Sequence, residues 1–177
     1  GGWRYAPKQP GDTSAVGWQL MALKSGNMAY LQVSPLTIKK AVEFLNRVQA
    51  DDGANYGYTD PGNGYGTSAV GLLCRMYLGW KKDNPALQRG VLRLAKAGPN
   101  ADLYYDYYAT QILHHMEGDV WVAWNTKMRD MLVKSQQTKG HAAGSWFEQF
   151  DKGHGPERGG RLYCTCLLYT SPSPRDR

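Results

Sequence analysis

The sequence predicts an all-α fold in which two kinds of helix alternate and form two layers. One phrase recurs: KAVEFLNRVQ at residues 40–49 returns as KMRDMLVKSQ at residues 127–136, with a shorter echo, RGVLRL, at residues 89–94. Recurrence at roughly 40 to 50 residues marks a stack of similar helical units, none of which buries its apolar face alone. Apolar residues at helical spacing and a second repeated string, TSAVG at residues 13–17 and 67–71, support the same class.

Three amphipathic helices are expected. The first begins at Ser34-Pro35, which supplies an N-cap and a first-turn proline. The second opens at Asn84-Pro85 and ends at Gly98-Pro99, and the third runs from about residue 119 to a point before Gly140. Their apolar positions follow i, i+3, i+4 and i+7 spacing. These positions are Ile38, Ala41, Val42, Leu45 and Val48, then Leu87, Val91, Leu94 and Ala95, then Trp121, Trp124, Met128, Met131 and Leu132.

The other helices are apolar on nearly all sides. They are expected near residues 12–26, 67–80 and 104–116, with a fourth from residue 161. A helix that is apolar all round must be covered on both sides, so we expect inner helices wrapped by the amphipathic ones. The glycine-rich segments 53–66 and 140–160 are the expected connections, and neither shows the alternation of a strand.

Charge and composition exclude several classes. The net charge is +6, but the basic residues are scattered along the polar sides of predicted helices, and no nucleic-acid module accompanies them. We therefore expect no nucleic-acid partner. No apolar run approaches 18 residues, which predicts no membrane span in this stretch. The three cysteines, Cys74, Cys164 and Cys166, form neither a disulfide framework nor a zinc spacing, and the cellular compartment stays open.

The last residues differ from everything before them. Residues 166–177 read CLLYTSPSPRDR, and the Ser-Pro pairs interrupt the helical pattern that starts near residue 160. The string resembles a translated sequencing adapter, so we interpret it as a non-native tail and residues 1–165 as the repeat region. The alternative is a genuine Ser-Pro linker to a further domain.

The recurring phrase, basic-small-x-x-aromatic-Leu-x-x-x-Gln followed by glycine and an aromatic residue, resembles the QW repeat of the squalene cyclase and protein prenyltransferase superfamily. Residues 1–165 look most like bacterial domains with prenyltransferase and squalene oxidase repeats. The resemblance implies an α/α toroid, incomplete here at about three and a half helical hairpins. It also implies structural roles for Phe44, for Gln49 with Tyr58 in place of tryptophan, and for Gln136 with Trp146.

The catalytic motifs of the related enzymes are missing from this sequence. It contains no D-x-D-D acid motif, no D-D-x-x-D magnesium motif, no D-x-C zinc pair and no G-C-G-E-Q thioester string. We therefore expect a binding or scaffold module of a larger bacterial protein, without metal or cofactor. Its expected partners are the remaining toroid repeats of the parent chain and an apolar or carbohydrate-like small ligand. The alternative is a fragment of a triterpene cyclase of the squalene-hopene type, an isomerase whose acid motif lies outside the fragment. A third class, a protein prenyltransferase subunit, would need a zinc triad and a partner chain.

Candidate ligand contacts lie mostly at the starts of the inner helices, because those starts share one end of a toroid. They are Asp12, Tyr104, Tyr107, Tyr108, His114, Arg161 and Tyr163. Tyrosine suits the wall of a pocket, since its ring is apolar and its hydroxyl polar. The alternative is that these tyrosines pack between layers and that His114 is buried and hydrogen-bonded. Glu157 and His154, in a glycine-rich segment, are the only acid–base pair to be considered for catalysis.

Overall fold

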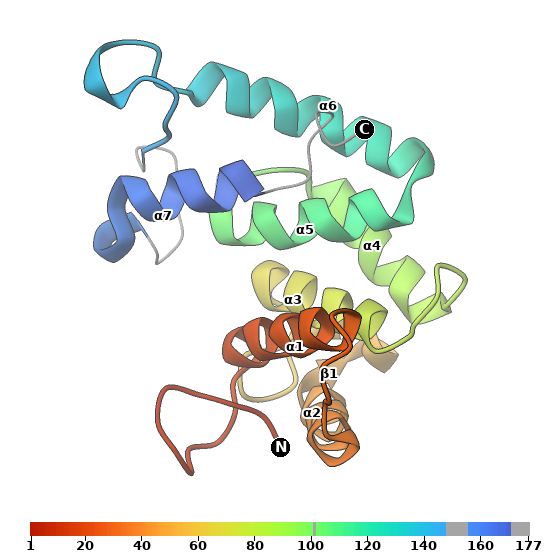
Figure 1. Cartoon of the computed structure of the whole chain (residues 1–177). Coiled ribbons are helices and arrows are strands. Elements are labelled where there is room, and N and C mark those ends of the chain that lie inside the picture. Colours follow the sequence, from red (N-terminus) through yellow and green to blue (C-terminus); the bar gives the residue numbers. More distant parts are fainter. Residues whose placement is uncertain (101, 148–155, 171–177) are drawn as a thin grey trace. The chain divides into compact units, whose positions relative to one another are not determined.

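The computed structural model describes residues 1–100, 102–147 and 156–170 and confirms a mostly helical chain of the all-α class (Figure 1). It divides into two compact units, residues 1–92 and 93–177, with helix α4 crossing the division. The described residues form α1 (Thr13–Met28), α2 (Pro35–Val48), α3 (Tyr65–Tyr77), α4 (Pro85–Ala97), α5 (Leu103–Met116), α6 (Gly118–Ser135) and α7 (Pro156–Thr170). Two strands, β1 (Gln49–Ala50) and β2 (Asn55–Tyr56), and two short 3₁₀ turns, η1 (Asp51–Gly53) and η2 (Gly140–Ala142), complete them.

Most helix ends follow the sequence signals. The side chain of Asp12 caps α1 by accepting a hydrogen bond of 2.8 Å from the backbone N–H of Ala15. Asn84 caps α4 in the same way, with its Oδ1 accepting from two backbone N–H groups of the first turn. Gly98 ends α4 with φ at +71°, a left-handed conformation that glycine adopts without strain. Local chemistry therefore sets these boundaries before any packing is considered.

In the first unit, α3 is the enclosed helix. Every residue from 68 to 75 is buried, because α1 and β2 pack against α3 and α4 approaches it closely at Gly90. The amphipathic helix α2 turns a stripe of buried residues inward, and the first part of α4 does the same. These buried residues are Ala41, Phe44, Leu45 and Val48 on α2 and Leu87 and Val91 on α4. The expected contrast between enclosed and amphipathic helices holds here.

Helix α1 departs from the expected pattern. It was expected to be covered on all sides, but Trp18 is 44% exposed and Met28 is 69% exposed. Its buried residues, such as Val16 and Leu20, lie on one side only. The cause is that α1 packs mainly against α3 and only slightly against α2, which leaves its remaining flank in contact with solvent. An apolar composition all round thus does not guarantee burial all round.

The connection after α2 also differs from expectation, because it contains a small antiparallel sheet. Gln49 pairs with Tyr56 and Ala50 with Asn55, and a tight turn at Asp51 and Asp52, both with positive φ, joins the two strands. A ladder of two residue pairs is too short to show the alternation of polar and apolar residues by which strands are recognised in sequence.

In the second unit, α5 is the enclosed helix. Residues 105–110 are all buried, and both α6 and α7 pack against it. Helix α6 contributes a buried stripe of Trp121, Trp124 and Met128. Helix α7 bends at Gly160, continues through residues 166–170 and buries Leu167 and Leu168. The rest of the predicted tail, residues 171–177, lies outside the described residues.

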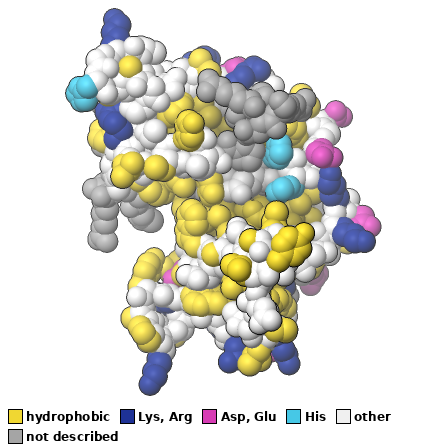
Figure 2. Space-filling view, in the orientation of Figure 1, with side chains coloured by type: hydrophobic (Ala, Val, Ile, Leu, Met, Phe, Trp, Pro, Cys, Tyr) yellow, Lys and Arg dark blue, Asp and Glu magenta, His cyan; other side chains and the backbone are white. Residues whose placement is uncertain are grey.

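Two surface properties bear on function. Among the described residues no helix combines the length and the apolar character that crossing a bilayer requires. On the face shown in Figure 2, Lys and Arg side chains stand scattered among apolar and polar ones.

Candidate functional site

A buried arginine joins the end of α2 to the enclosed helix α3. Arg75 is only 4% exposed and donates to three neutral acceptors: Tyr56 Oη at 2.9 Å, Asn46 Oδ1 at 2.7 Å and Gln49 Oε1 at 3.0 Å. Its guanidinium also lies over the ring of Trp80, 5.1 Å from the centroid. Burial raises the pKa of Tyr56, and the positive charge of Arg75 opposes part of that rise. Gln49, Tyr56 and Arg75 therefore form a hydrogen-bonded junction between the end of α2 and helix α3.

The aromatic residue at this junction is Tyr56 rather than Tyr58. The Tyr56 ring is fully buried against Gly71 of α3, whereas Tyr58 is 38% exposed and its hydroxyl lies 3.5 Å from that of Tyr5. Phe44 is fully buried. Tyr58 contributes through its backbone instead, because its carbonyl accepts from Thr13 N–H at 2.9 Å.

A comparable junction follows α6 in the second unit. Gln136 Nε2 donates to the Gly144 carbonyl at 3.0 Å, and Trp146 Nε1 donates to the Leu132 carbonyl at 2.9 Å. The backbone N–H of Trp146 donates to Thr165 Oγ1 at 3.2 Å, and Arg161 donates to Ser145 Oγ at 2.9 Å. These contacts tie the turn at residues 140–146 back to α6 and forward to α7.

In the first unit, the starts of α1 and α3 meet at one segment. Thr13 Oγ1 donates to the Gly57 carbonyl at 2.6 Å, and Thr67 Oγ1 donates to the Tyr56 carbonyl at 2.7 Å. Both threonines open a TSAVG string, so the repeated string places equivalent hydroxyls on neighbouring carbonyls. The two helices therefore begin at the same end of this unit.

The predicted tyrosine site on α5 is a packed aromatic cluster. Tyr107 and Tyr108 are buried, with ring centroids 5.0 Å apart, and Tyr104 lies 4.9 Å from Tyr108. His114 packs edge-on against Trp121, with 4.9 Å between centroids. The burial of Tyr107 and Tyr108 and the contact of His114 with Trp121 of α6 favour the alternative that these rings pack between helices.

The remaining candidates are dispersed. Arg161 lies over the ring of Phe147, 4.9 Å from its centroid, and Tyr163 lies half-buried in the middle of α7. Asp12 belongs to the first unit and the other predicted contacts to the second. His154 lies outside the described residues, and for Glu157 only the position within α7 is described. Within the described ranges, no cluster of His, Cys, Asp and Glu is suited to a metal ion.

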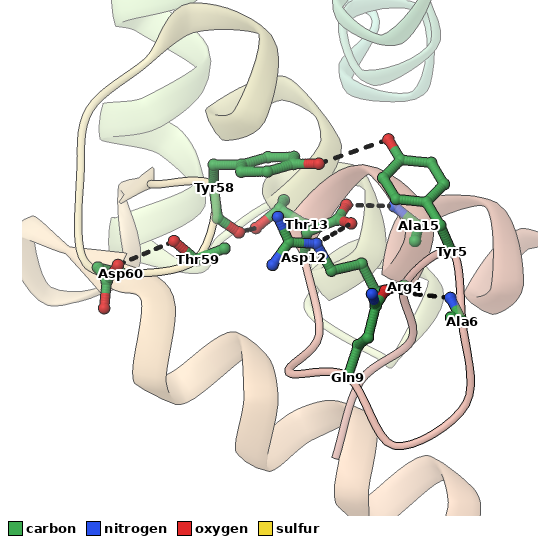
Figure 3. A network of polar contacts seen from close by, with 10 residues as sticks. All are labelled: Arg4, Tyr5, Ala6, Gln9, Asp12, Thr13, Ala15, Tyr58, Thr59 and Asp60. Carbon is green, nitrogen blue, oxygen red and sulfur yellow. Dashed lines mark hydrogen bonds and ion pairs between the residues drawn. The ribbon is translucent and has the colours of Figure 1, made fainter.

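Asp12 is the centre of a polar network in the first unit (Figure 3). Its carboxylate is fully buried, with Oδ1 capping α1 and Oδ2 lying 3.7 Å from Arg4 Nε. The Arg4 guanidinium in turn lies over the Tyr58 ring, 5.8 Å from the centroid. Partial burial, the hydrogen bond with Tyr5 and the negative charge of Asp12 all raise the pKa of Tyr58, so this phenol stays neutral across the physiological range.

An open hollow of about 720 Å³ lies beside this network. Its charged and polar lining comprises Arg4, Lys8, Gln9, Arg47, Thr59 and Asp60, which carry three positive charges and one negative charge. The lining comes from the loop before α1, from α2 and from the loop after β2. Small-molecule sites are concave and contain a few convergent polar groups. This hollow shares both features, but it is open and its lining is mainly polar.

Two glycines form the base of the hollow. A Cβ atom on Gly11 would lie 2.8 Å from Gly2 Cα and 3.0 Å from the Phe44 ring, so only glycine allows the two ends of this loop to meet. A hydrogen bond of 3.0 Å from Asp12 N–H to the Trp3 carbonyl closes the same loop. Sequence reasoning did not find this site, because residues 1–11 have no periodicity. The signal for this site in the sequence was the presence of basic residues among the glycines and prolines of residues 1–11.

Compared with protein-family models, curated proteins and solved structures, the chain matches none. The assignment of function therefore depends on the repeats and on the geometry just described.

Proposed function

We propose that this chain is part of an incomplete α/α toroid of squalene-cyclase/prenyltransferase-like repeats and acts as a binding or scaffold module. The observation that carries the proposal is the junction built twice, once at Gln49 after α2 and once at Gln136 after α6. In both places a glutamine at the end of an amphipathic helix hydrogen-bonds into the structure that follows it. Repeated junctions of this kind let neighbouring helical repeats pack against one another.

The hollow beside Asp12 is the proposed ligand site. It lies beside the start of α1, which Asp12, one of the expected ligand contacts, caps. Its polar lining favours a carbohydrate-like or charged ligand over an apolar one. The absence of the acid and metal motifs from residues 1–177 supports binding rather than cyclisation or prenyl transfer.

The exposed flank of α1 supports the proposed partners of the module. Trp18 and Met28 leave apolar surface on α1, whereas the matching helix α3 is buried along residues 68–75. We propose that a neighbouring repeat of a longer parent chain covers this flank, because apolar patches of this kind mark interaction sites.

Two experiments test the proposal. In the first, the purified chain is incubated with squalene or farnesyl diphosphate, and products are sought by gas chromatography and mass spectrometry. We expect none. A cyclised product would establish the isomerase alternative, and prenyl transfer would establish the transferase class.

The second experiment measures the melting temperature of the chain with increasing concentrations of neutral saccharides, acidic saccharides and organic acids. We expect a saturable rise with at least one of them, because a ligand that binds only the folded state stabilises it. Gln9→Trp, which fills the hollow from an exposed loop position, should abolish the rise. Gln19→Trp, at an exposed position on α1, should retain it. If no compound raises the melting temperature, or if both variants respond alike, the ligand site is misplaced.

A further inference from the structure

Of the three basic side chains that line the hollow, only Arg4 has a counter-ion among the described residues. In the described part of the chain, neither Lys8 nor Arg47 has a carboxylate within ion-pair distance. Arg4 has one such partner, Asp12, whose Oδ2 lies 3.7 Å from Arg4 Nε. The two terminal nitrogens of the Arg4 guanidinium have no acceptor among the described residues. Asp60 is the only carboxylate in the lining, and its Oδ2 accepts a hydrogen bond from Thr59. The side chains that line the hollow therefore carry three positive charges and one negative charge, a net charge of +2.

The cations are held in place by structure that precedes any ligand. Buried Asp12 is fixed by its cap on α1 and by the loop closure at Trp3, so it orients Arg4. Arg47 projects from α2, with its guanidinium over the Phe44 ring at 5.1 Å. Lys8 has φ at +63°, a left-handed conformation that costs a lysine about 1 kcal/mol or more. The loop around it is tied by a hydrogen bond of 3.1 Å from Ala6 N–H to Gln9 Oε1.

We infer that the hollow binds a small polyanion carrying two or more carboxylate or phosphate groups. Guanidinium groups match both anions through paired N–H donors, and a lysine ammonium adds a point charge. The volume of about 720 Å³ accommodates a multiply charged organic anion rather than a single chloride. An anion in the hollow would also relieve the mutual repulsion of the three cations. The neutral groups of Gln9 and Thr59 then serve as orienting partners.

This inference deepens the proposed function, since it names the ligand class of the proposed site. Its test is isothermal titration calorimetry of the full chain with citrate and, separately, with tripolyphosphate, at constant ionic strength in Tris buffer. The two probes distinguish a carboxylate site from a phosphate site. We expect saturable one-to-one binding of at least one probe.

The variants separate a specific site from general electrostatic attraction. Lys8→Gln with Arg47→Gln should weaken binding by about tenfold or more, because two charged contacts are lost. Lys24→Gln with Lys81→Gln removes the same charge from exposed positions outside the hollow lining and should weaken it less than about twofold. Arg47→Gln alone changes an exposed helical position and should give an intermediate loss in a chain with unchanged circular dichroism.

Two results would overturn the inference: no saturable heat with either probe, or equal losses in the two double variants. The proposed function fails separately. If neutral saccharides raise the melting temperature in a Gln9-dependent way while both anions fail to bind, the module stands and the polyanion inference falls. If the chain converts squalene or a prenyl diphosphate to product, the binding-module proposal falls, and the calorimetry still decides the anion site.

Discussion

The close contact between Gly71 and Tyr56 allows a sharp test of the packing around α3. A Cβ atom at Gly71 would lie 2.5 Å from Tyr56 Cδ2 and closer still to Cγ, although real Cβ contacts below 3.0 Å are essentially unknown. Tyr56 has little freedom to move away, because its hydroxyl accepts from Arg75 at 2.9 Å and its ring is fully buried. Gly71→Ala should therefore overpack the core.

Two opposing effects set the magnitude. Replacing a mid-helix glycine by alanine gains about 0.5–1 kcal/mol of helix stability. Overpacking costs typically about 1–3 kcal/mol and more where the neighbours are fixed. Because the clash involves a ring held at both ends, the cost of overpacking should exceed the gain in helix stability. We expect a net destabilisation of about 1–2 kcal/mol.

The assay is urea unfolding followed by circular dichroism, with Gly26→Ala as the matched control. Gly26 also lies within a helix, but the nearest atom to a Cβ there is Leu31 Cδ1, at 3.8 Å. The control should therefore gain about 0.5–1 kcal/mol. If Gly71→Ala is as stable as the parent, or gains like the control, Tyr56 does not pack against α3 and the proposed junction is wrong.

Two further predictions follow from buried groups. Arg75→Met should lower the free energy of unfolding by about 2–4 kcal/mol, because buried acceptors lose a charged donor. The control is Arg89→Met, which breaks an exposed ion pair with Asp51 and should cost less than about 1 kcal/mol in the same urea assay. Burial raises the pKa of Cys74 from 9.0 to about 12, so iodoacetamide at pH 8 should label exposed Cys166 and spare Cys74, as read by mass spectrometry. The Cys74 thiol ionises at a lower pH in the unfolded chain than in the folded chain. The contribution of the buried thiol to the free energy of unfolding should therefore be complete below pH 9 and be lost as the pH rises towards 12. Labelling of native Cys74 would show that α3 is not enclosed.

Much of the helical framework could be predicted from local chemistry. Asp12, Asn84 and Gly98 act within one turn of their own positions, so their effect on helix ends needs no tertiary information. The buried stripes of α2 and α4 follow from spacing alone, because apolar residues at i, i+3, i+4 and i+7 lie on one face of a helix.

The rest depends on contacts between distant segments. Arg75 lies in an otherwise apolar stretch, and only its position beside Asn46, Gln49 and Tyr56 shows how its charge is accommodated. A charge inside an apolar helix requires hydrogen-bond partners, but the local sequence does not identify the segment that supplies them. The exposure of Trp18 likewise depends on which helices flank α1, which composition does not specify.

The candidate site was harder to predict than the fold. Its base is a close approach of Gly2 and Gly11, and its cations come from a loop and from α2. Loop residues carry no periodic signal, so their convergence with Arg47 was not predictable from spacing. The tyrosines of α5, by contrast, were easily identified in the sequence. Their role was not, because aromatic residues occur both in pockets and in cores.

Hydrogen exchange measured by mass spectrometry tests most directly whether α3 and α5 are the enclosed helices of their units. Amides protected only by local structure open readily, whereas those of a buried core exchange near the global unfolding limit. We predict that residues 68–75 and 105–113 exchange slowest, on the order of a hundredfold more slowly than the exposed first turns of α2 and α6. Equal exchange rates in α3 and in the first turn of α2 would contradict the two-layer arrangement.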